Sequence, residues 1–398
     1  MARLVIVGGG LASAKVVQAY REEGGADEIA LVSADSYVPY HRPPLSKRFL
    51  RGEIEADGTF VAEEDFYRDN DVELRLETHV ERVEPDERRL ELAGGEQVPY
   101  DRLVLATGAT PRTLGVPGGD LDGVFQLRTL ANSAAIREAA SSAQRAVVVG
   151  GSFIGSEVAA SLRTLGLDVT LVHRGTGIFD LLGSTDLSDY LNELYRSRGV
   201  ELVFGDSVAE FVGNGSVTRV RTTGGRKLEA DLAVEGVGVS LNLGLLDSTG
   251  VEIGDGVIVD ERYVTSAPEV YAAGDIANYP DPIAERRRRI EHWSNANTTG
   301  TRLGTILAAG DPGPLPVASF FSEVFGASFR VFGDTVGYAA VATRGSFDDG
   351  KAAVLYADDA GTLRGALSFG LESEEEDELK VLIERRAPAA DVPGFGPQ

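Results

Sequence analysis

Near the start of the chain, a glycine-rich turn has the residue types that hold a diphosphate. Gly8 permits a tight turn after an apolar run, Gly10 lets the backbone approach phosphate oxygens, and the small Ser13 stands at a third glycine position. A helix that begins at this turn would direct free N–H groups and its positive dipole end at the phosphates. Asp35, at the end of the next apolar run, can accept hydrogen bonds from a ribose. We therefore expect a dinucleotide site, the alternative being an ordinary glycine turn.

A second glycine-rich turn repeats the pattern further along the chain. Gly150 and Gly155 occupy the first and third glycine positions, and Ser152 replaces the second, which slightly crowds the approach of a phosphate. Two such turns predict two dinucleotides, and hence electron transfer between them. The strand after this turn ends in His173 and Arg174, which would attract a 2′-phosphate, whereas a carboxylate there would repel it. We expect NADPH to be preferred over NADH, unless these two residues form only a solvated loop.

Both turns follow apolar runs that alternate with amphipathic stretches, a pattern typical of parallel sheets flanked by helices. The clearest strand-like runs are Leu4–Val7, Ala30–Val32, Leu103–Ala106, Ala146–Val149, Val169–Val172 and Val270–Ala273. A proline-rich linker follows Ala309. Beyond it we expect three β-like runs, a charged helix and a loose end, at Val336–Val341, Ala352–Tyr356, Leu363–Phe369, Ser373–Arg385 and Ala387–Gln398.

The composition excludes several classes of function. The chain of 398 residues has a net charge of −24, which disfavours binding to nucleic acids or anionic membranes. It has no cysteine, so disulfides, cysteine-bound metal centres and a redox-active dithiol are excluded. Its 4 histidines have no metal-ligand spacing, and we expect no metal site. No apolar run suits a transmembrane helix, and the first strand pattern leaves no room for a signal peptide, so we expect a cytoplasmic protein.

Several further segments are informative through their order along the chain. They are Pro39–Lys47, Thr78–Val80, Ala106–Gly108, Leu127–Thr129, Val234–Val239 and Tyr271–Asp275. In this order they resemble the FAD-dependent pyridine nucleotide oxidoreductases. The nearest branch is the ferredoxin and rubredoxin reductases, related to monodehydroascorbate reductases and apoptosis-inducing-factor-like proteins. The resemblance spans about residues 2–334, and each segment taken alone is a weak signal.

The resemblance implies two cofactors, FAD and NADPH or NADH, and assigns residues to each. Those assigned to FAD are Gly8, Gly10, Leu11, Ala12, Asp35, Arg42, Lys47, Val80, Ala106, Thr107, Gly108, Arg128, Gly274, Asp275, His292, Trp293 and Phe321. Those assigned to NAD(P)H are Gly150, Gly151, Ser152, Phe153, Ile154, Gly155, Glu157, His173, Arg174, Gly236, Val237 and Gly238. We predict an ion pair between Lys47 and Glu157, the alternative being an unpaired acid at a helix N-terminus. Glu235 occupies a position that is usually apolar, and the sequence gives no reason for it.

A local basic run in this acidic chain predicts a docking surface. Four consecutive arginines precede the only tryptophan, Trp293. They are Arg286, Arg287, Arg288 and Arg289. The resemblance places this segment at the flavin edge, where an acidic iron–sulfur protein of the ferredoxin type could dock and take electrons past Trp293. The alternative is that the arginines are solvated or pair with the protein's own acids.

We expect an α/β protein with two Rossmann-like dinucleotide-binding domains, for FAD and NAD(P)H, and a small C-terminal α+β domain. The FAD domain would be discontinuous (1–112 and 243–308), the NAD(P)H domain would cover 113–242, and the C-terminal reductase domain 309–398. Because no thiol can take the electrons, the resemblance favours a ferredoxin–NAD(P)+ reductase, with Lys47, Glu157 and Trp293 as catalytic residues, that serves a cytochrome P450 or a Rieske oxygenase.

Two alternatives remain open. The first is a reductase of a small oxidant such as a quinone, an ascorbate radical or dioxygen. Phe321 stands where ferredoxin reductases often have tryptophan, which brings the chain closer to the monodehydroascorbate-reductase and apoptosis-inducing-factor-like branches. The second is a redox-gated binding protein of the apoptosis-inducing-factor type. In either case we expect a monomer or a homodimer that has neither a nucleic-acid nor a membrane partner.

Overall fold

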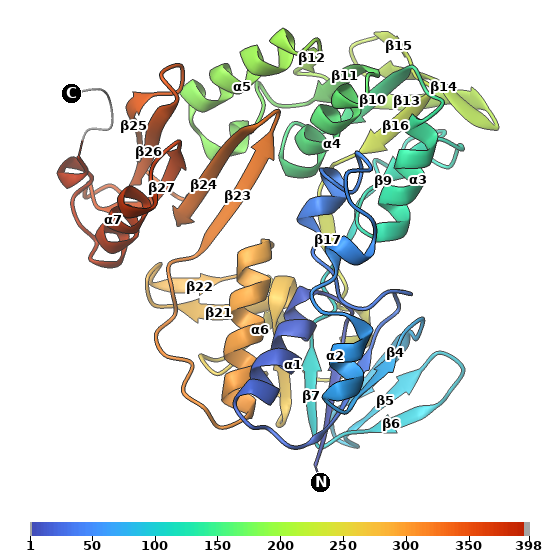
Figure 1. Cartoon of the computed structure of the whole chain (residues 1–398), viewed down its shortest axis with the longest axis vertical. Coiled ribbons are helices and arrows are strands. Elements are labelled where there is room, and N and C mark those ends of the chain that lie inside the picture. The colour runs from blue at the N-terminus through green and yellow to red at the C-terminus, as the bar shows by residue number, and fades with distance from the viewer. Residues whose placement is uncertain (1, 394–398) are drawn as a thin grey trace. The chain divides into compact units, whose positions relative to one another are not determined.

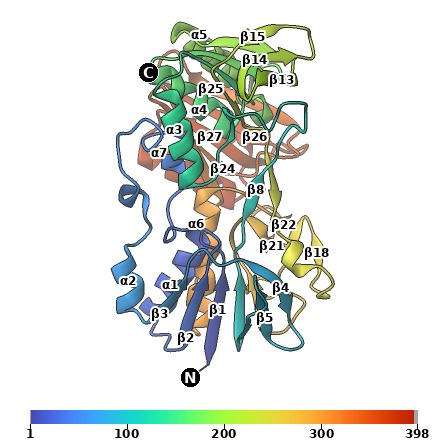
Figure 2. The ribbon, with the colours of Figure 1, turned by 90° about the vertical axis from the view of Figure 1, so that its right-hand side faces the viewer.

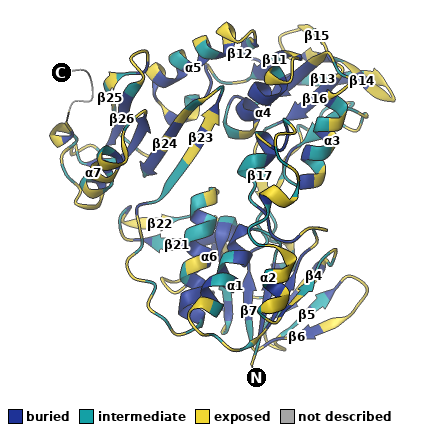
Figure 3. Cartoon of the chain, in the orientation of Figure 1, coloured by how far each residue is buried: buried dark blue, intermediate teal, exposed yellow. Residues whose placement is uncertain are grey.

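The computed structural model describes residues 2–393 of the chain, which divides into two compact units. Unit 1 is made of Met1–Arg42, Ala56–Thr110 and Ser240–Pro316, and unit 2 of Pro43–Glu55, Pro111–Val239 and Val317–Gln398. Each unit has buried strands under partly exposed helices (Figure 3). The division into three domains stays a prediction. Residues 394–398 of the expected loose end lie outside the described residues.

Unit 1 is built on a five-stranded parallel sheet of order β20-β7-β1-β2-β3. Its strands are β1 (Arg3–Val7), β2 (Glu28–Val32), β3 (Val72–Arg75), β7 (Arg102–Leu105) and β20 (Val270–Ala272). The central strand β1 is apolar and buried from Leu4 to Val7, as a strand covered on both faces requires. Helices α1 (Leu11–Glu22) and α6 (Trp293–Leu307) lie side by side (Figures 1 and 2). Gly300 allows this, because a Cβ there would lie 2.4 Å from the carbonyl oxygen of Ala12.

Smaller elements complete unit 1. A short helix, α2 (Glu64–Asp69), precedes β3. A three-stranded antiparallel sheet contains β4 (Val80–Glu84), β5 (Arg89–Leu92) and β6 (Gln97–Pro99). A four-stranded sheet contains β18 (Ile253–Gly254), β19 (Gly256–Ile258), β21 (Ala277–Asp281) and β22 (Arg286–Arg288). Two of the points at which the chain passes between the units lie within β8 (Ala109–Pro111) and β17 (Val239–Leu241).

Unit 2 contains a second five-stranded parallel sheet, of order β12-β11-β10-β16-β9. Its strands are β9 (Val124–Gln126), β10 (Arg145–Val149), β11 (Asp168–His173), β12 (Glu201–Phe204) and β16 (Leu232–Glu235). The accompanying helices are α3 (Leu130–Ala140), α4 (Phe153–Thr164) and α5 (Thr185–Ser197). A three-stranded antiparallel sheet holds β13 (Val208–Asn214), β14 (Ser216–Thr222) and β15 (Lys227–Glu229). The fold class predicted from the sequence, α/β with parallel sheets of the Rossmann type, is confirmed.

The C-terminal part of unit 2 is an antiparallel sheet of order β23-β24-β27-β26-β25 with helix α7 (Ser373–Glu384) beside it. Its strands are β23 (Ser319–Val324), β24 (Ala327–Gly333), β25 (Ala340–Ser346), β26 (Lys351–Ala357) and β27 (Leu363–Phe369). The strand expected at 336–341 is wrong for its first four residues, because Val336 is 71% exposed and Gly337 turns the chain at φ +74°.

The expected loose end is also partly wrong. The backbone N–H of Leu363 donates to the carbonyl of Ala387, and that of Ala389 donates to Gly361. These bonds fix residues 387–389 beside the start of β27, where the backbone groups would otherwise need water. Within residues 2–393, no helix combines the length and apolar character needed to span a bilayer.

Candidate functional site

The first glycine turn lies at the carboxyl end of β1, where the parallel sheet opens onto a helix N-terminus. Gly8 has φ +127°, and a Cβ on it would lie 2.1 Å from the carbonyl oxygen of Ala106. Gly10 is the N-cap of α1, and no side chain caps the helix. A Cβ on Gly10 would meet nothing within 4 Å, so open space lies beside the free N–H groups. This is the shape and polarity that a phosphate needs.

Other residues assigned to FAD gather around this turn in unit 1. A Cβ on Gly274 would lie 3.1 Å from that of Ala12 in the first turn of α1, and the Gly274 N–H donates to Thr299 Oγ1 of α6 at 2.9 Å. Thr107 Oγ1 donates to the carbonyl of Asn242 at 2.7 Å. The structure therefore brings the segments 8–12, 106–108 and 274–275 together, although they are far apart in the sequence.

Asp35 follows β2, as expected for an acid that receives a ribose. Its Oδ2 already accepts a 2.6 Å hydrogen bond from Tyr40 Oη, which holds the carboxylate in place. The Asp35 carbonyl accepts from the N–H of Glu77, three residues before Val80, so the start of β4 is fixed beside the Asp35 segment. Arg42 ends the first segment of unit 1. Lys47, Arg128 and Phe321, also assigned to FAD, belong to unit 2.

The second glycine turn has the same construction in unit 2. Ser152 is the N-cap of α4, and its side chain makes no capping bond, in contrast to Thr129 and Ser184, which cap α3 and α5. A Cβ on Gly155 would lie 2.1 Å from the carbonyl oxygen of Gly150. Gly236, after β16, is also close-packed, because its Cβ would lie 2.9 Å from the Gly155 nitrogen. Three glycines thus let α4, the turn and β16 approach one another closely.

His173 is a structural part of this turn. Its Nδ1 accepts from the Gly151 N–H at 3.1 Å, and its Nε2 lies 3.2 Å from Asp180 Oδ1. Burial alone would raise the pKa of Asp180, but hydrogen bonds from the Thr176 N–H and His173 outweigh it and lower that pKa. Both ring nitrogens of His173 are therefore engaged, whereas the neighbouring Arg174 is exposed. The expectation that His173 and Arg174 attract a 2′-phosphate stays a prediction.

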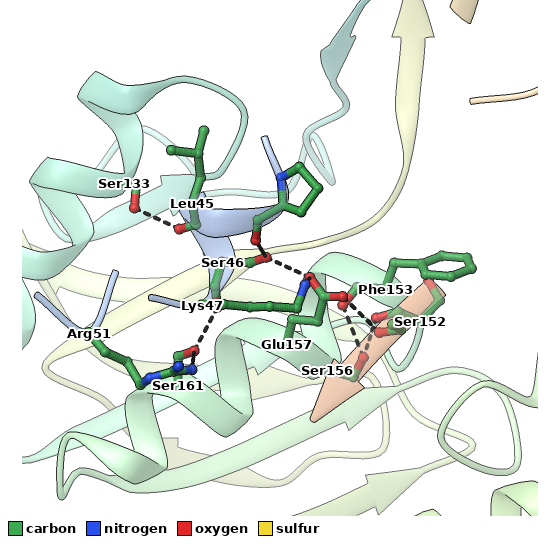
Figure 4. A network of polar contacts seen from close by, with 12 residues as sticks. Leu45, Ser46, Lys47, Arg51, Ser133, Ser152, Phe153, Ser156, Glu157 and Ser161 are labelled. Carbon is green, nitrogen blue, oxygen red and sulfur yellow. Dashed lines mark hydrogen bonds and ion pairs between the residues drawn. The ribbon is translucent and has the colours of Figure 1, made fainter. Parts of the chain in front are cut away.

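The predicted ion pair between Lys47 and Glu157 is confirmed, with Nζ 2.6 Å from Oε2 (Figure 4). Glu157 is the fifth residue of α4, so it lies in the second helical turn rather than the first. Ser46 Oγ donates to the same carboxylate oxygen at 2.5 Å (Figure 4). Ser322 Oγ of β23 donates to Oε1 at 2.7 Å. Three donors therefore hold a carboxylate that is 5% exposed, as burial of a charge requires.

Glu235, unexplained by the sequence, is 3% exposed at the end of β16. One carboxylate oxygen accepts from the Leu114 N–H at 3.0 Å, and the other from Gln126 Nε2 at 2.5 Å. Glu235 therefore fixes the chain that enters unit 2 onto the carboxyl edge of the parallel sheet, directly before Gly236. Its only signal in the sequence was an acid at the end of an apolar strand.

The arginine run forms β22 and the residue after it. Arg288 Nη1 lies 3.1 Å from Asp281 Oδ2, and Arg289 pairs with Asp255 at 2.7 Å and with Glu291. The alternative that arginines pair with the protein's own acids is thus correct for these two. Arg286 and Arg287 are exposed in unit 1. The Arg287 guanidinium donates to the carbonyl of Val259 at 2.7 Å, and the docking surface near the four arginines stays a prediction.

Next to this run, the N-terminus of α6 carries His292 and Trp293. Burial lowers the pKa of His292 to about 4, against the opposing effect of Asp275, so this N-cap ring is neutral at neutral pH. The Trp293 indole is 37% exposed, and its Nε1 donates to His41 Nδ1 at 2.9 Å. Sequence reasoning gave no role to His41, Ser46, Ser322 or Asp180, because spacing does not reveal such partners.

The comparisons with known proteins agree with this geometry. The model of the pyridine nucleotide-disulphide oxidoreductase family matches residues 2–300. The chain belongs to this family. It is 32% identical to putidaredoxin reductase CamA of Pseudomonas putida, over 89% of this chain and 85% of the relative. It is 31% identical to the ferredoxin–NAD(+) reductase subunit of a benzene 1,2-dioxygenase system of the same species, over 88% and 85%.

Among solved structures, this oxidoreductase resembles putidaredoxin reductase in its covalent complex with putidaredoxin. The TM-score is 0.93 at 30% identity, with 97% of this chain and 94% of that chain covered. The resemblance drawn from the sequence motifs is confirmed. Members of the family use FAD and NAD(P)H, so this protein is an FAD- and NAD(P)H-dependent oxidoreductase. The open space at Gly10 and the uncapped N-termini of α1 and α4 fit the diphosphates of these coenzymes.

Proposed function

We propose that this oxidoreductase transfers electrons from NAD(P)H to a ferredoxin-type iron–sulfur protein that serves a cytochrome P450 or a Rieske oxygenase. The observation that carries the proposal is twofold. The chain has two glycine turns, each followed by a helix without a side-chain cap, and it contains no cysteine. A flavin, when bound, accepts a hydride and can release electrons singly, as an iron–sulfur acceptor needs. Relatives named as ferredoxin reductases support the proposal.

The site residues have separate tasks in this proposal. Gly8, Gly10, Leu11, Ala12 and the other residues assigned to FAD hold that coenzyme. The second turn, from Gly150 to Gly155, together with 236–238, holds the pyridine nucleotide. In the domain division that accompanies this proposal, FAD belongs to 1–112 and 243–308, NAD(P)H to 113–242, and 309–398 is the C-terminal reductase domain.

Lys47 and Glu157 are the proposed catalytic pair. Lys47 offers a positive charge that Glu157 fixes at 2.6 Å and that water reaches little, since its side chain is 12% exposed. A fixed charge in a poorly solvated place acts more strongly on developing charge than one in water. Lys47 would therefore stabilise negative charge that develops on a bound flavin, and Glu157 would hold Lys47 in place. Trp293, partly exposed on α6, is the proposed point of electron exit.

For the nucleotide, we propose that NADPH is preferred over NADH. Arg174 supports this, because it is exposed after β11, where a carboxylate would select against a 2′-phosphate. His173 contributes less than the sequence suggests, since both its nitrogens are engaged. For the partner, we propose docking near Arg286 and Arg287, with Arg288 and Arg289 fixing the hairpin that carries them.

The deciding experiment is NAD(P)H-driven reduction of cytochrome c with and without added ferredoxin. Cytochrome c reduction that requires a [2Fe–2S] ferredoxin, from a panel of such proteins, supports the proposal. Equal rates without ferredoxin, together with rapid quinone or dioxygen reduction, would favour the second candidate, a reductase of small oxidants. Phe321, 40% exposed on β23, is the observation that favours this second candidate.

A further inference from the structure

His41 and Trp293 form a hydrogen bond that joins two distant segments of unit 1. The indole Nε1–H donates to His41 Nδ1 at 2.9 Å, and the two ring centroids are 5.6 Å apart at an interplanar angle of 48°. The residues are 252 positions apart in the sequence. Trp293 opens α6, whereas His41 lies in the irregular segment after Asp35. The contact is therefore a product of the tertiary structure.

Both partners stand on anchored backbone. The His41 N–H donates to the carbonyl of Thr59 at 2.8 Å. Helix α6 packs closely on α1 through Gly300 and Gly304, where a Cβ would lie 2.4 Å and 2.5 Å from carbonyl oxygens of α1. The backbone on either side is thus fixed, and the bond to His41 restricts the rotation of the partly exposed indole about its own side-chain bonds.

The bond defines the protonation state of His41. Nδ1 can accept a hydrogen bond only when it carries no proton, so the ring is neutral with its proton on Nε2. Burial, and after it the nearby Lys15 of α1, lower the pKa of His41 and favour this neutral form. The imidazole Nδ1 therefore accepts the hydrogen bond from the indole at neutral pH.

We propose that His41 is a positioning residue, which fixes the orientation of Trp293 and thereby the surface that the protein offers to its electron acceptor. The inference rests on the proposed function, in which electrons leave past Trp293. Without a hydrogen-bond acceptor at position 41, a typical side-chain hydrogen bond is lost, and the population of the hydrogen-bonded orientation of Trp293 falls about fivefold. An indole that no longer holds one orientation presents a less complementary face to a protein partner, whereas a small acceptor is affected little.

The test uses the holoenzyme and its single tryptophan, whose emission on excitation above the tyrosine band reports on Trp293 alone. His41→Leu removes the hydrogen-bond acceptor. His41→Asn retains a hydrogen-bond acceptor, because its amide oxygen lies near the position of Nδ1. Trp293→Phe gives the background signal. We expect His41→Leu to lower the emission anisotropy and to increase quenching by acrylamide at least twofold, and His41→Asn to remain near the wild type. Unchanged anisotropy and quenching in His41→Leu would overturn the proposal.

Kinetics with the same variants test whether the His41–Trp293 hydrogen bond affects the reduction of a protein electron acceptor. For a [2Fe–2S] ferredoxin, His41→Leu should raise KM at least threefold, with the rate of flavin reduction by NAD(P)H unchanged and with His41→Asn restoring KM. A mobile indole with an unchanged ferredoxin KM would refute the link to the acceptor surface. If the wild type reduces no ferredoxin, the proposed function fails by itself, and the link to a protein acceptor fails with it. The fluorescence of the two variants still decides whether His41 positions Trp293.

Discussion

Ser322 donates a 2.7 Å hydrogen bond to the carboxylate of Glu157, so a strand of the C-terminal antiparallel sheet reaches the acid that pairs with Lys47. Ser322 is fully buried, and the neighbouring Phe320 meets Phe153 of α4 edge to face at 5.4 Å. Strand β23 therefore does more than pack beside α4. It supplies one of the three donors that fix the buried carboxylate, which couples the C-terminal sheet to the proposed catalytic pair.

Removal of this donor should affect catalysis and not only stability. Ser322→Ala leaves Glu157 Oε1 without its hydroxyl donor and should cost about 1–3 kcal/mol of unfolding free energy. Ser368→Ala is the matched control, because Ser368 is another buried serine, which donates to the buried Glu376 at 2.5 Å. We expect both to lose stability, but only Ser322→Ala to slow flavin reduction in stopped-flow measurements with FAD retained. Glu157→Ala, which removes the carboxylate itself, should slow flavin reduction in the same direction. Equal reduction rates in the two serine variants would show that the bond is purely structural.

Substitution of the two glycines of the first turn should separate FAD binding from folding. A Cβ at Gly8 would lie 2.1 Å from the Ala106 carbonyl oxygen at a φ of +127°, whereas at Gly10 the space is open and the backbone is extended. Gly8→Ala should therefore destabilise the fold by several kcal/mol, roughly the cost of a strained, overpacked site. Gly10→Val should fold normally but bind FAD at least about tenfold more weakly, because its side chain fills the phosphate space. The measurements are denaturation curves and the FAD content of the purified proteins. Full FAD content in Gly10→Val would exclude this turn as the FAD site.

The nucleotide preference should depend on Arg174. Arg174→Ala removes the guanidinium that is proposed to pair with the 2′-phosphate. It should lower kcat/KM for NADPH by about tenfold or more and change kcat/KM for NADH by less than about twofold. Arg226→Ala provides a control for the general loss of positive charge, since Arg226 is exposed elsewhere in unit 2. The measurement is kcat/KM for NADPH and for NADH, obtained by steady-state kinetics. A wild type that prefers NADH, or an equal decrease for both nucleotides, contradicts the proposed preference.

Charge reversal should distinguish a docking surface from a structural hairpin. Arg286→Glu combined with Arg287→Glu should raise KM for an acidic ferredoxin by about tenfold at low salt, with a smaller effect as salt screens the charges. A neutral quinone dye should be reduced at an unchanged rate. Arg226→Glu makes the same kind of charge change in unit 2 and should leave the ferredoxin KM nearly unchanged. A similar rise in KM for ferredoxin and dye would mean that the hairpin itself has been damaged.

The fluorescence of Trp293 should respond to pH through His41. Protonation of Nδ1 breaks the hydrogen bond and places a quenching imidazolium against the indole. Since burial and Lys15 lower the pKa of His41, the emission should be constant through neutral pH and fall only below the ordinary histidine range. Lys15→Gln removes one of the two causes, so the midpoint of the fall should move to higher pH. His41→Asn should show no such transition, and a wild-type titration that survives in this variant would assign it to another group.

The repeated patterns of the sequence determined the fold class and the two glycine turns. Their local physics is self-contained, because a tight turn without side chains at the end of an apolar parallel strand has few structural outcomes. The expected strands at 4–7 and 146–149 were therefore found with nearly the same bounds. The ion pair of Lys47 with Glu157 was also predicted, but through the resemblance to a family and not through spacing.

Contacts between segments far apart in the chain were decided only by the tertiary structure. Ser322 against Glu157, the Glu235 carboxylate on Leu114 and Gln126, and Trp293 on His41 each join residues more than 100 positions apart. The pairing of Arg288 and Arg289 with nearby acids likewise depends on the β21–β22 hairpin. A hydrogen bond needs its two atoms within about 3 Å. Composition and periodicity fix which residues face the core, but only the packed sheets fix which polar atoms come that close.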